Sequence, residues 1–245
     1  MTKSFLKHFL YIAILFAGIN LTHAQSVDKN YLLGKFDPAT NPLFSKLEDA
    51  HARGSAKDGY LRTETYEAFK KMCAAAKADG VELIIISATR NFDSQKRIWE
   101  NKWEGRTIVE GINLTTVKDP KERARLILLY SSMPTTSRHH WGTDMDLNNL
   151  NNDYFSTGEG LKIYQWLTAH AVEYGFCQPY TSKEGGRTGY EEEKWHWSYL
   201  PLSGEFLEAY KKRVTYKDIN GFKGAEAARP MAVAKNYVEG VACKK

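Results

Sequence analysis

The sequence has few cysteines, and their spacing excludes the protein classes that depend on cysteine. Its three cysteines, Cys73, Cys177 and Cys243, lie far apart, so the chain has no Cys-x-x-Cys metal motif and no disulfide framework. At most one bridge can form among them. Cys73 falls on the apolar side of a predicted helix and Cys177 follows a Gly-Phe strand start. We therefore expect both to be buried small hydrophobic residues.

Long apolar runs are absent after the first 21 residues. The chain begins with the basic residues Lys3 and Lys7, continues with the apolar run Phe9–Leu21, and then has small residues up to Ala24. This order is typical of a cleaved signal peptide over residues 1–24. An uncleaved anchor is the alternative, although the run is short for a membrane span. We expect a secreted or periplasmic protein with no integral membrane segment after signal removal.

Charge of one sign is not concentrated anywhere in the chain. The 34 Lys and Arg residues exceed the 29 Asp and Glu residues, which gives a net charge of +5. Without Lys3 and Lys7 of the predicted signal peptide, the net charge falls to +3. This mild excess suits an anionic cell-wall polymer as partner, but it lacks the basic patches of nucleic-acid binders. We expect a monomer that binds no nucleic acid.

The sequence also lacks internal repeats, low-complexity segments, a glycine-rich phosphate loop and regular βαβ alternation. A chain of 245 residues with 42% hydrophobic residues is long enough for one sizeable core. Helices interleaved with a few strands predict an α+β domain, in which a small antiparallel sheet with surrounding helices carries the functional site. The expected limits are residues 25–62 for an N-terminal arm, 63–214 for the main domain and 215–245 for a C-terminal extension.

Apolar spacing predicts the elements around this site. Thr63–Ala78 has helical periodicity, and the β-branched run Val81–Ser87 predicts a central strand that delivers Arg90 at its end. Two more helices are expected next, one that is capped by Asp93 and one that Asp119-Pro120 starts and that runs to about Tyr130. The remaining predicted elements are helices over residues 161–174 and 205–213 and strands from residue 176 and over residues 194–199.

Residues 137–146, Ser-Arg-His-His-Trp-Gly-Thr-Asp-Met-Asp, contain two imidazoles and two carboxylates. Neutral imidazole and ionised carboxylate are zinc ligands, and a catalytic zinc site has three protein ligands and a fourth position for water. His139 or His140 can serve, and so can Asp144 or Asp146, because the two aspartates point to one face of a strand. The residues alone leave both choices open.

The third ligand must come from another part of the chain. Outside the predicted signal peptide, His51 and His170 have ordinary helical or loop surroundings, whereas His196 ends the group Glu193-Lys194-Trp195-His196. His196 is therefore the natural third ligand. Glu193 lies three residues earlier and can act as the general base for a water molecule at the metal. Two histidines and one aspartate favour zinc, and the arrangement predicts metal-assisted hydrolysis.

Three short motifs resemble those of the VanY-type D-alanyl-D-alanine carboxypeptidases, a branch of the LAS metallopeptidases. They occur in the family's order over roughly residues 60 to 200, which makes the resemblance specific. The matching residues are Ser87, Arg90 and Gln95 for S-x-x-R-x-x-x-x-Q, Ser137, His139, Gly142 and Asp146 for S-x-H-x-x-G-x-x-x-D, and Glu193, Trp195 and His196 for E-x-W-H.

The resemblance implies a hedgehog/DD-peptidase-like fold and resolves the open choices at the site. It implies a Zn²⁺ ion held by His139, Asp146 and His196, with Glu193 as the catalytic base. It also favours a substrate-facing Arg90, whose guanidinium can bind the developing oxyanion or the terminal carboxylate of the substrate.

The resemblance further implies a peptidoglycan stem peptide as substrate, with release of the terminal D-Ala by a carboxypeptidase. Ser137 and Gln95 are candidate substrate-binding residues. Asp144 departs from the family pattern, which has a small residue there, and can orient a ligand imidazole or meet a substrate amine. Two alternatives stay open, a cell-wall endopeptidase of the endolysin kind and an inactive zinc-bearing binding module.

Overall fold

The computed structural model describes residues 27–243, so the predicted signal peptide, residues 1–24, lies outside the described part of the chain. The fold is α+β, as predicted from the sequence. Within the described residues, no helix combines the length and the apolar character needed to cross a membrane. The strands are β1 (Phe44–Lys46), β2 (Tyr60–Arg62), β3 (Ile85–Ser87), β4 (Asp144–Leu147), β5 (Phe176–Cys177) and β6 (His196–Tyr199).

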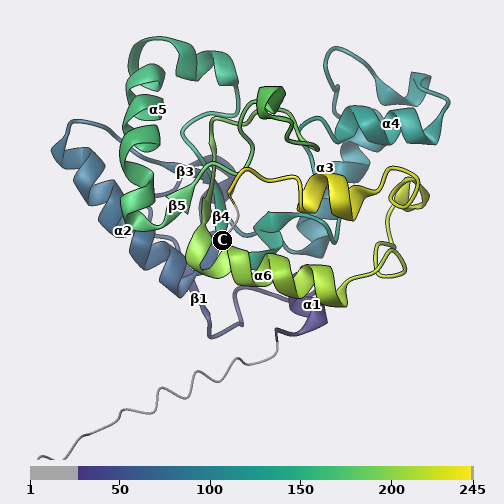
Figure 1. The fold of residues 1–245 in the computed structure, drawn as a ribbon, viewed down its shortest axis with the longest axis horizontal. Coiled ribbons are helices and arrows are strands. Elements are labelled where there is room, and N and C mark those ends of the chain that lie inside the picture. The colour runs from purple at the N-terminus through teal and green to yellow at the C-terminus, as the bar shows by residue number, and fades with distance from the viewer. Residues whose placement is uncertain (1–26, 244–245) are drawn as a thin grey trace, which may run out of the picture.

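The strands form two antiparallel sheets that helices surround (Figure 1). β1 pairs with β2, and the larger sheet has the strand order β3-β4-β6-β5. The α-helices are α1 (Lys29–Leu32), α2 (Thr63–Ala78), α3 (Phe92–Trp103), α4 (Pro120–Ile127), α5 (Gly158–His170) and α6 (Leu200–Arg213). Short 3-10 helices cover 54–56, 114–116, 138–141, 152–156, 171–174, 183–185 and 225–227, and a π-helix covers 234–238.

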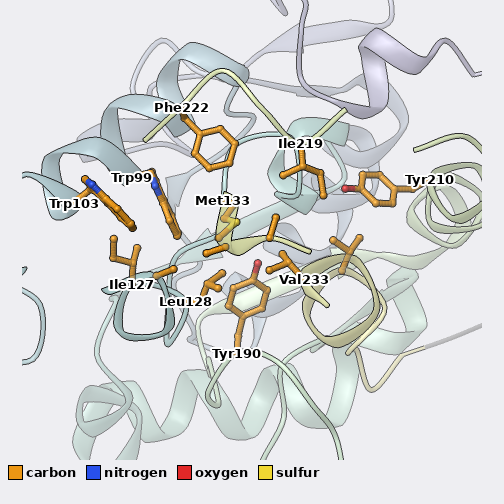
Figure 2. Packing of buried hydrophobic residues seen from close by; sticks show 14 of the residues in the cluster. Trp99, Trp103, Ile127, Leu128, Met133, Tyr190, Tyr210, Ile219, Phe222 and Val233 are labelled. Atoms are coloured by element: carbon orange, nitrogen blue, oxygen red, sulfur yellow. The ribbon is translucent and has the colours of Figure 1, made fainter. Parts of the chain in front are cut away.

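Two hydrophobic cores lie on either side of the larger sheet. The first joins α2 and α5 to the apolar residues of β4 and β6, including Met145, Leu147 and Trp197. The second joins α3, α4 and α6 to the C-terminal residues, and Figure 2 shows Trp99 and Trp103 of α3 near Phe222 in it. Figure 1 shows α2 and α5 to the left of the sheet and α3 and α4 to the right. The sheet therefore separates the two cores.

Several elements begin or end where local sequence signals place them. α2 spans Thr63–Ala78 as predicted, and the Asp119 side chain accepts a hydrogen bond from the Lys121 amide at 3.0 Å at the start of α4. α3 is capped by Asn91, whose side chain accepts from the Ser94 amide, and not by Asp93. The bounds of three helices differ from the predicted ones. α4 ends at Ile127 and not near Tyr130, the predicted helix 161–174 is α5 followed by a 3-10 turn, and α6 begins at Leu200 and not at 205.

The prediction of a central strand over residues 81–87 is wrong in length and in position. Only Ile85–Ser87 forms a strand, and β3 lies at the edge of the sheet. Residues 81–87 are mostly apolar because the segment with His51 and Arg53 covers the β3 edge of the sheet. The Ile85 amide donates to the His51 carbonyl and the Ile85 carbonyl accepts from the Arg53 amide, both at 2.9 Å. A covered edge strand is buried like a central one, so its composition is the same.

The C-terminal residues are joined covalently to the sheet. Cys177 of β5 forms a disulfide with Cys243, with a Cα–Cα distance of 6.3 Å and a sequence separation of 66. Cys73 is a partly buried free thiol. The prediction that Cys177 is only a buried hydrophobic residue is therefore wrong, whereas the limit of one bridge is confirmed. The pairing was not visible in the sequence because it depends on how the last 30 residues pack.

Candidate metal centre and its cavity

The larger sheet brings two of the predicted ligands together. Asp146 of β4 lies directly opposite His196 of β6 in the antiparallel register. Directly opposed residues project to the same face with neighbouring side chains. Met145, Leu147 and Trp197 face the first core, so Asp146 and His196 face the other side of the sheet. The alternation of apolar and polar residues along both strands thus creates the site.

The third ligand arrives from the turn before β4. His139 lies in the 3-10 helix Arg138–Trp141, which ends at Gly142 with the left-handed φ of 72°. A Cβ atom at Gly142 would collide with the Phe44 ring, so this position requires glycine for two reasons. The Ala88 carbonyl accepts a hydrogen bond from His139 Nδ1 at 2.9 Å. This bond leaves Nε2 as the nitrogen with a free lone pair, directed at the site.

His139, Asp146 and His196 form a buried group whose ligand atoms all lie within 4.8 Å of one another. Asp146 Oδ1 lies 3.4 Å from His139 Nε2 and 3.3 Å from His196 Nδ1. A tetrahedral zinc ion with bonds of about 2.0 Å separates its ligands by about 3.3 Å. His139 Nε2 and Asp146 Oδ1 are buried without a hydrogen-bond partner among the described residues. The three side chains therefore fit a divalent cation, and zinc by their chemistry.

Asp144 fixes the ring of His196. It lies on the same face of β4 as Asp146, and its Oδ1 atom accepts from His196 Nε2 at 3.0 Å. Asp144 is fully buried and also accepts from Arg138, Thr143 and Ser198. Burial opposes ionisation, but the Arg138 charge and the His196 hydrogen bond keep the pKa of Asp144 well below its usual range. Because an ionised carboxylate only accepts, His196 Nδ1 is left free for a metal.

His140 has a structural role. Its Nδ1 donates to the Arg90 carbonyl at 2.5 Å, and its Nε2 accepts from the Thr135 amide at 3.1 Å. Burial lowers the pKa of His140 to about 3, so the ring is neutral and both nitrogens are used. The structure thus separates His139 from His140 on geometric grounds, and Asp146 from Asp144 in the same way.

Glu193 lies beside the ligands. Its Oε2 atom is 3.2 Å from His196 Nδ1, and the residue is 4% exposed. Burial raises the pKa of Glu193, while the neighbouring His196 partly offsets the rise. Its backbone is fixed because the Glu193 amide donates to the Tyr180 carbonyl at 2.9 Å. A carboxylate of raised basicity therefore borders the place where the three ligands converge.

Arg90 lies on the other side of the ligands, after β3. Its Nη1 is 4.0 Å from Asp146 Oδ2 and donates to Ser87 Oγ at 3.3 Å. The side chain is 25% exposed, and its Nε has no hydrogen-bond partner among the described residues. The His139 carbonyl accepts from the Arg90 amide at 3.2 Å, which ties the arginine to the ligand turn. The guanidinium is thus free to bind an anionic group.

One cavity of about 730 Å³ contains these groups, with all three ligands, Glu193 and Arg90 in its wall. The two other predicted residues lie behind the wall. Gln95 is buried, and its Nε2 donates to the Ser132 carbonyl at 2.8 Å. Ser137 is buried at the start of the ligand turn, and its Oγ has no hydrogen-bond partner within residues 27–243. Neither lines the cavity, so their contact with substrate stays a prediction.

Among the residues of the cavity wall that sequence reasoning missed are Tyr180 and Lys102. Tyr180 packs edge-on against His196 with ring centroids 4.7 Å apart, and Lys102 follows Ile98 by one helical turn on α3. The spacing of Gln95, Ile98 and Lys102 places them on one face of a helix, and this signal was available in the sequence. No comparable signal marks Tyr180, because it lies in a loop.

Comparison with known proteins identifies relatives of the chain. Residues 58–202 match the family model described as VanY, D-alanyl-D-alanine carboxypeptidase. YodJ of Bacillus subtilis, named provisionally as a carboxypeptidase, is 30% identical over 185 residues, which is 71% of this chain and 58% of that protein. A D-alanyl-D-alanine carboxypeptidase of Enterococcus faecalis is 29% identical over 128 residues, 52% of this chain and 44% of that protein. The chain thus spans about half the length of these relatives.

The fold has a solved counterpart. The structure of the LD-carboxypeptidase LdcB superposes with a TM-score of 0.52 at 24% identity, and the match covers 85% of this chain and 81% of that one.

Proposed function

Because the chain belongs to the VanY family of D-alanyl-D-alanine carboxypeptidases, we propose that it is a zinc carboxypeptidase that removes the C-terminal D-Ala from peptidoglycan stem peptides. One observation carries this proposal. A single cavity contains the ligand group His139, Asp146 and His196, the buried carboxylate of Glu193 and the partly exposed guanidinium of Arg90. The names of the relatives support the substrate class.

The metal ligands and Glu193 have separate roles in the proposed hydrolysis. Zinc bound at the three ligands supplies the positive charge that makes a water molecule acidic and polarises the scissile carbonyl. Glu193 takes the proton of the attacking water, since its carboxylate borders the ligands. The same carboxylate then gives this proton to the leaving amine nitrogen. Burial of the Glu193 carboxylate strengthens its electrostatic interactions.

Arg90 stabilises negative charge on the substrate. The Arg90 backbone amide donates a hydrogen bond to the His139 carbonyl, and the side-chain Nη1 donates to Ser87 Oγ. These two hydrogen bonds hold the residue at the edge of the ligand group. The partly exposed guanidinium lines the cavity and can donate to the oxyanion that develops at the scissile carbonyl. A planar guanidinium binds such an oxygen with a directed, charge-assisted hydrogen bond.

Export to an oxidising compartment is part of the proposal. Its support is the basic and apolar order of residues 1–24 together with the Cys177–Cys243 disulfide. Disulfides persist in secreted and periplasmic proteins and are rare in the reducing cytosol. Fractionation of cells that express the full chain, with an antibody to the C-terminal region, tests this part. Recovery of uncleaved protein in the cytosol would contradict it.

Mass spectrometry of a stem pentapeptide incubated with the zinc-loaded protein tests the activity. We expect loss of one alanine, and a decrease in kcat of about 10²- to 10⁴-fold in Glu193→Ala. Glu192→Ala is the matched control, because Glu192 is the adjacent carboxylate and does not line the cavity. Chelation of the metal should also abolish the reaction.

An intact pentapeptide would reject the carboxypeptidase, provided that the protein is folded and binds zinc. Cleavage of cross-linked muropeptides instead would identify an endopeptidase. Peptide binding without cleavage of either substrate would identify a zinc-bearing binding module.

A further inference from the structure

Lys102 is a cationic side chain in the cavity wall that the proposed mechanism does not use. It lies on α3 one turn after Ile98, and both residues line the cavity. Its Nζ donates a hydrogen bond to Ser131 Oγ at 2.6 Å, and Ser131 lines the same cavity. An ammonium group has three donors, so two are left for other partners.

The charge of Lys102 is not neutralised by the protein. Among the described residues, no carboxylate lies within ion-pair distance of its Nζ. Burial lowers the pKa of Lys102, and the nearby Arg90 lowers it further, while Glu193 and Glu110 act from a distance in the opposite direction. A partly buried charge that lacks a counterion is unfavourable, and an anionic ligand relieves that cost.

We propose that Lys102 is a specificity-determining residue that binds a carboxylate of the substrate. This inference rests on the proposed function, because it concerns the same cavity. Lys102 and Arg90 both line the cavity that contains Glu193 and the metal ligands. A substrate in this cavity therefore meets two cationic side chains in addition to the metal. Arg90 contacts Asp146, whereas the hydrogen-bond partner of Lys102 in the described part of the chain is the neutral Ser131 hydroxyl. Lys102 is thus the cation available for a second anionic group.

A stem peptide offers this carboxylate from two sources. One is the C-terminal carboxylate, which every carboxypeptidase substrate has. The other is the side-chain carboxylate of a diaminopimelate residue at the third position, which a lysine residue there lacks. The recognition chemistry is the same for both, an ammonium group paired with a carboxylate in a partly buried site. The choice of peptides distinguishes them.

The test compares three variants of the zinc-loaded protein on two pentapeptides that end in D-Ala-D-Ala. The peptides differ at the third position, with lysine in one and meso-diaminopimelate in the other. Lys102→Met removes the charge and keeps the length of the side chain, and Lys102→Arg keeps the charge. Arg97→Met is the control, because Arg97 is an exposed cation of α3 that does not line the cavity. Zinc content and melting temperature verify that each variant is folded.

We expect Lys102→Met to raise KM by about 10- to 100-fold, the range of one charged hydrogen bond, with kcat changed by less than about threefold. Lys102→Arg should recover most of this loss. An equal rise for both peptides identifies the C-terminal carboxylate, and a rise for the diaminopimelate peptide alone identifies the side-chain carboxylate. A KM for Lys102→Met that matches Arg97→Met on both peptides would overturn the proposal.

Failure of the proposed function gives a different result. Wild-type protein that cleaves neither peptide rejects the carboxypeptidase, and calorimetric titration of both peptides into the zinc-loaded protein then decides the role of Lys102. Weaker binding to Lys102→Met than to Arg97→Met would support it. Equal binding to the two variants, or no binding to the wild type, would reject it.

Discussion

At the scale of single residues, the buried ion pair of Arg138 and Asp144 orients one of the three metal ligands. The two side chains are 3% and 0% exposed and lie 3.0 Å apart. Asp144 also accepts from His196 Nε2, so one carboxylate neutralises an arginine and orients a metal ligand. Partners of this kind typically change metal affinity by about 10- to 100-fold when removed. Asp144 therefore links the stability of the site to its metal affinity.

Asp144→Ala should show both effects. We expect zinc affinity to fall by about 10- to 100-fold in a chelator competition assay. We also expect a loss of about 3–5 kcal/mol in the free energy of unfolding, because Arg138 is left as a buried unpaired charge. The double variant Arg138→Met/Asp144→Ala should recover most of the stability but not the zinc affinity. Equal recovery of both would show that Asp144 acts only through the ion pair.

The adjacent histidines should behave differently when each is replaced. His139→Ala removes a ligand, so we expect zinc stoichiometry to fall below one at micromolar zinc with the fold retained. His140→Ala leaves the Thr135 amide and the Arg90 carbonyl without their partner. It should retain zinc and lose about 1–3 kcal/mol of stability. Metal analysis and urea unfolding measure these effects, and zinc loss in both variants at equal stability would contradict the assignment.

The sequence indicated that histidine and aspartate bind a metal, but without the family resemblance it did not show which of the adjacent histidines and aspartates do so. Two histidines and two aspartates within ten residues indicate a metal, but Asp144 and Asp146 share a face in any strand. The family resemblance chose Asp146, and the register against His196 supplies the physical reason. The shared helix face of Ile98 and Lys102 was visible in the sequence, but its position in the cavity wall was not, because that depends on how α3 packs.

At the scale of elements, the turn between the 3-10 helix 138–141 and β4 brings two of the three ligands together. It delivers His139 before the turn and Asp146 after it, and the Gly142 carbonyl accepts from the Arg62 amide at 2.9 Å. Helices α2 and α4 were predictable because periodicity and capping are local. β3 was not, because a covered edge strand has the composition of a central one.

Gly142→Ala tests this turn. Alanine at φ 72° is strained, and its Cβ would collide with the Phe44 ring, so we expect a loss of about 1–3 kcal/mol in the free energy of unfolding together with weaker zinc binding. Gly185→Ala is the control, because a Cβ there meets nothing within 4 Å. Urea unfolding and zinc titration are the measurements. An unchanged Gly142→Ala would show that the turn tolerates other conformations.

At the scale of the whole molecule, the C-terminal residues support the cavity from behind. The Tyr190 side chain lines the cavity, and its ring packs against Tyr237 with centroids 5.0 Å apart. The Gly240 carbonyl accepts a hydrogen bond from Arg187 at 3.3 Å, close to the disulfide at Cys243. The extension thus holds the loop before Glu193 against the second core. Sequence periodicity was too weak there to predict this packing.

Removal of the disulfide should therefore weaken both the fold and the cavity wall. Closing a loop of 66 residues stabilises a chain by about 4 kcal/mol in the entropic account. We expect Cys177→Ser/Cys243→Ser to lower the free energy of unfolding by about 2–4 kcal/mol and to increase protease cleavage after residue 214. Cys73→Ala is the matched control, because Cys73 has no disulfide partner. Zinc affinity should change little, since all three ligands come from the sheet and its adjoining turn. A large loss of zinc affinity would instead mean that the extension shapes the ligand group itself.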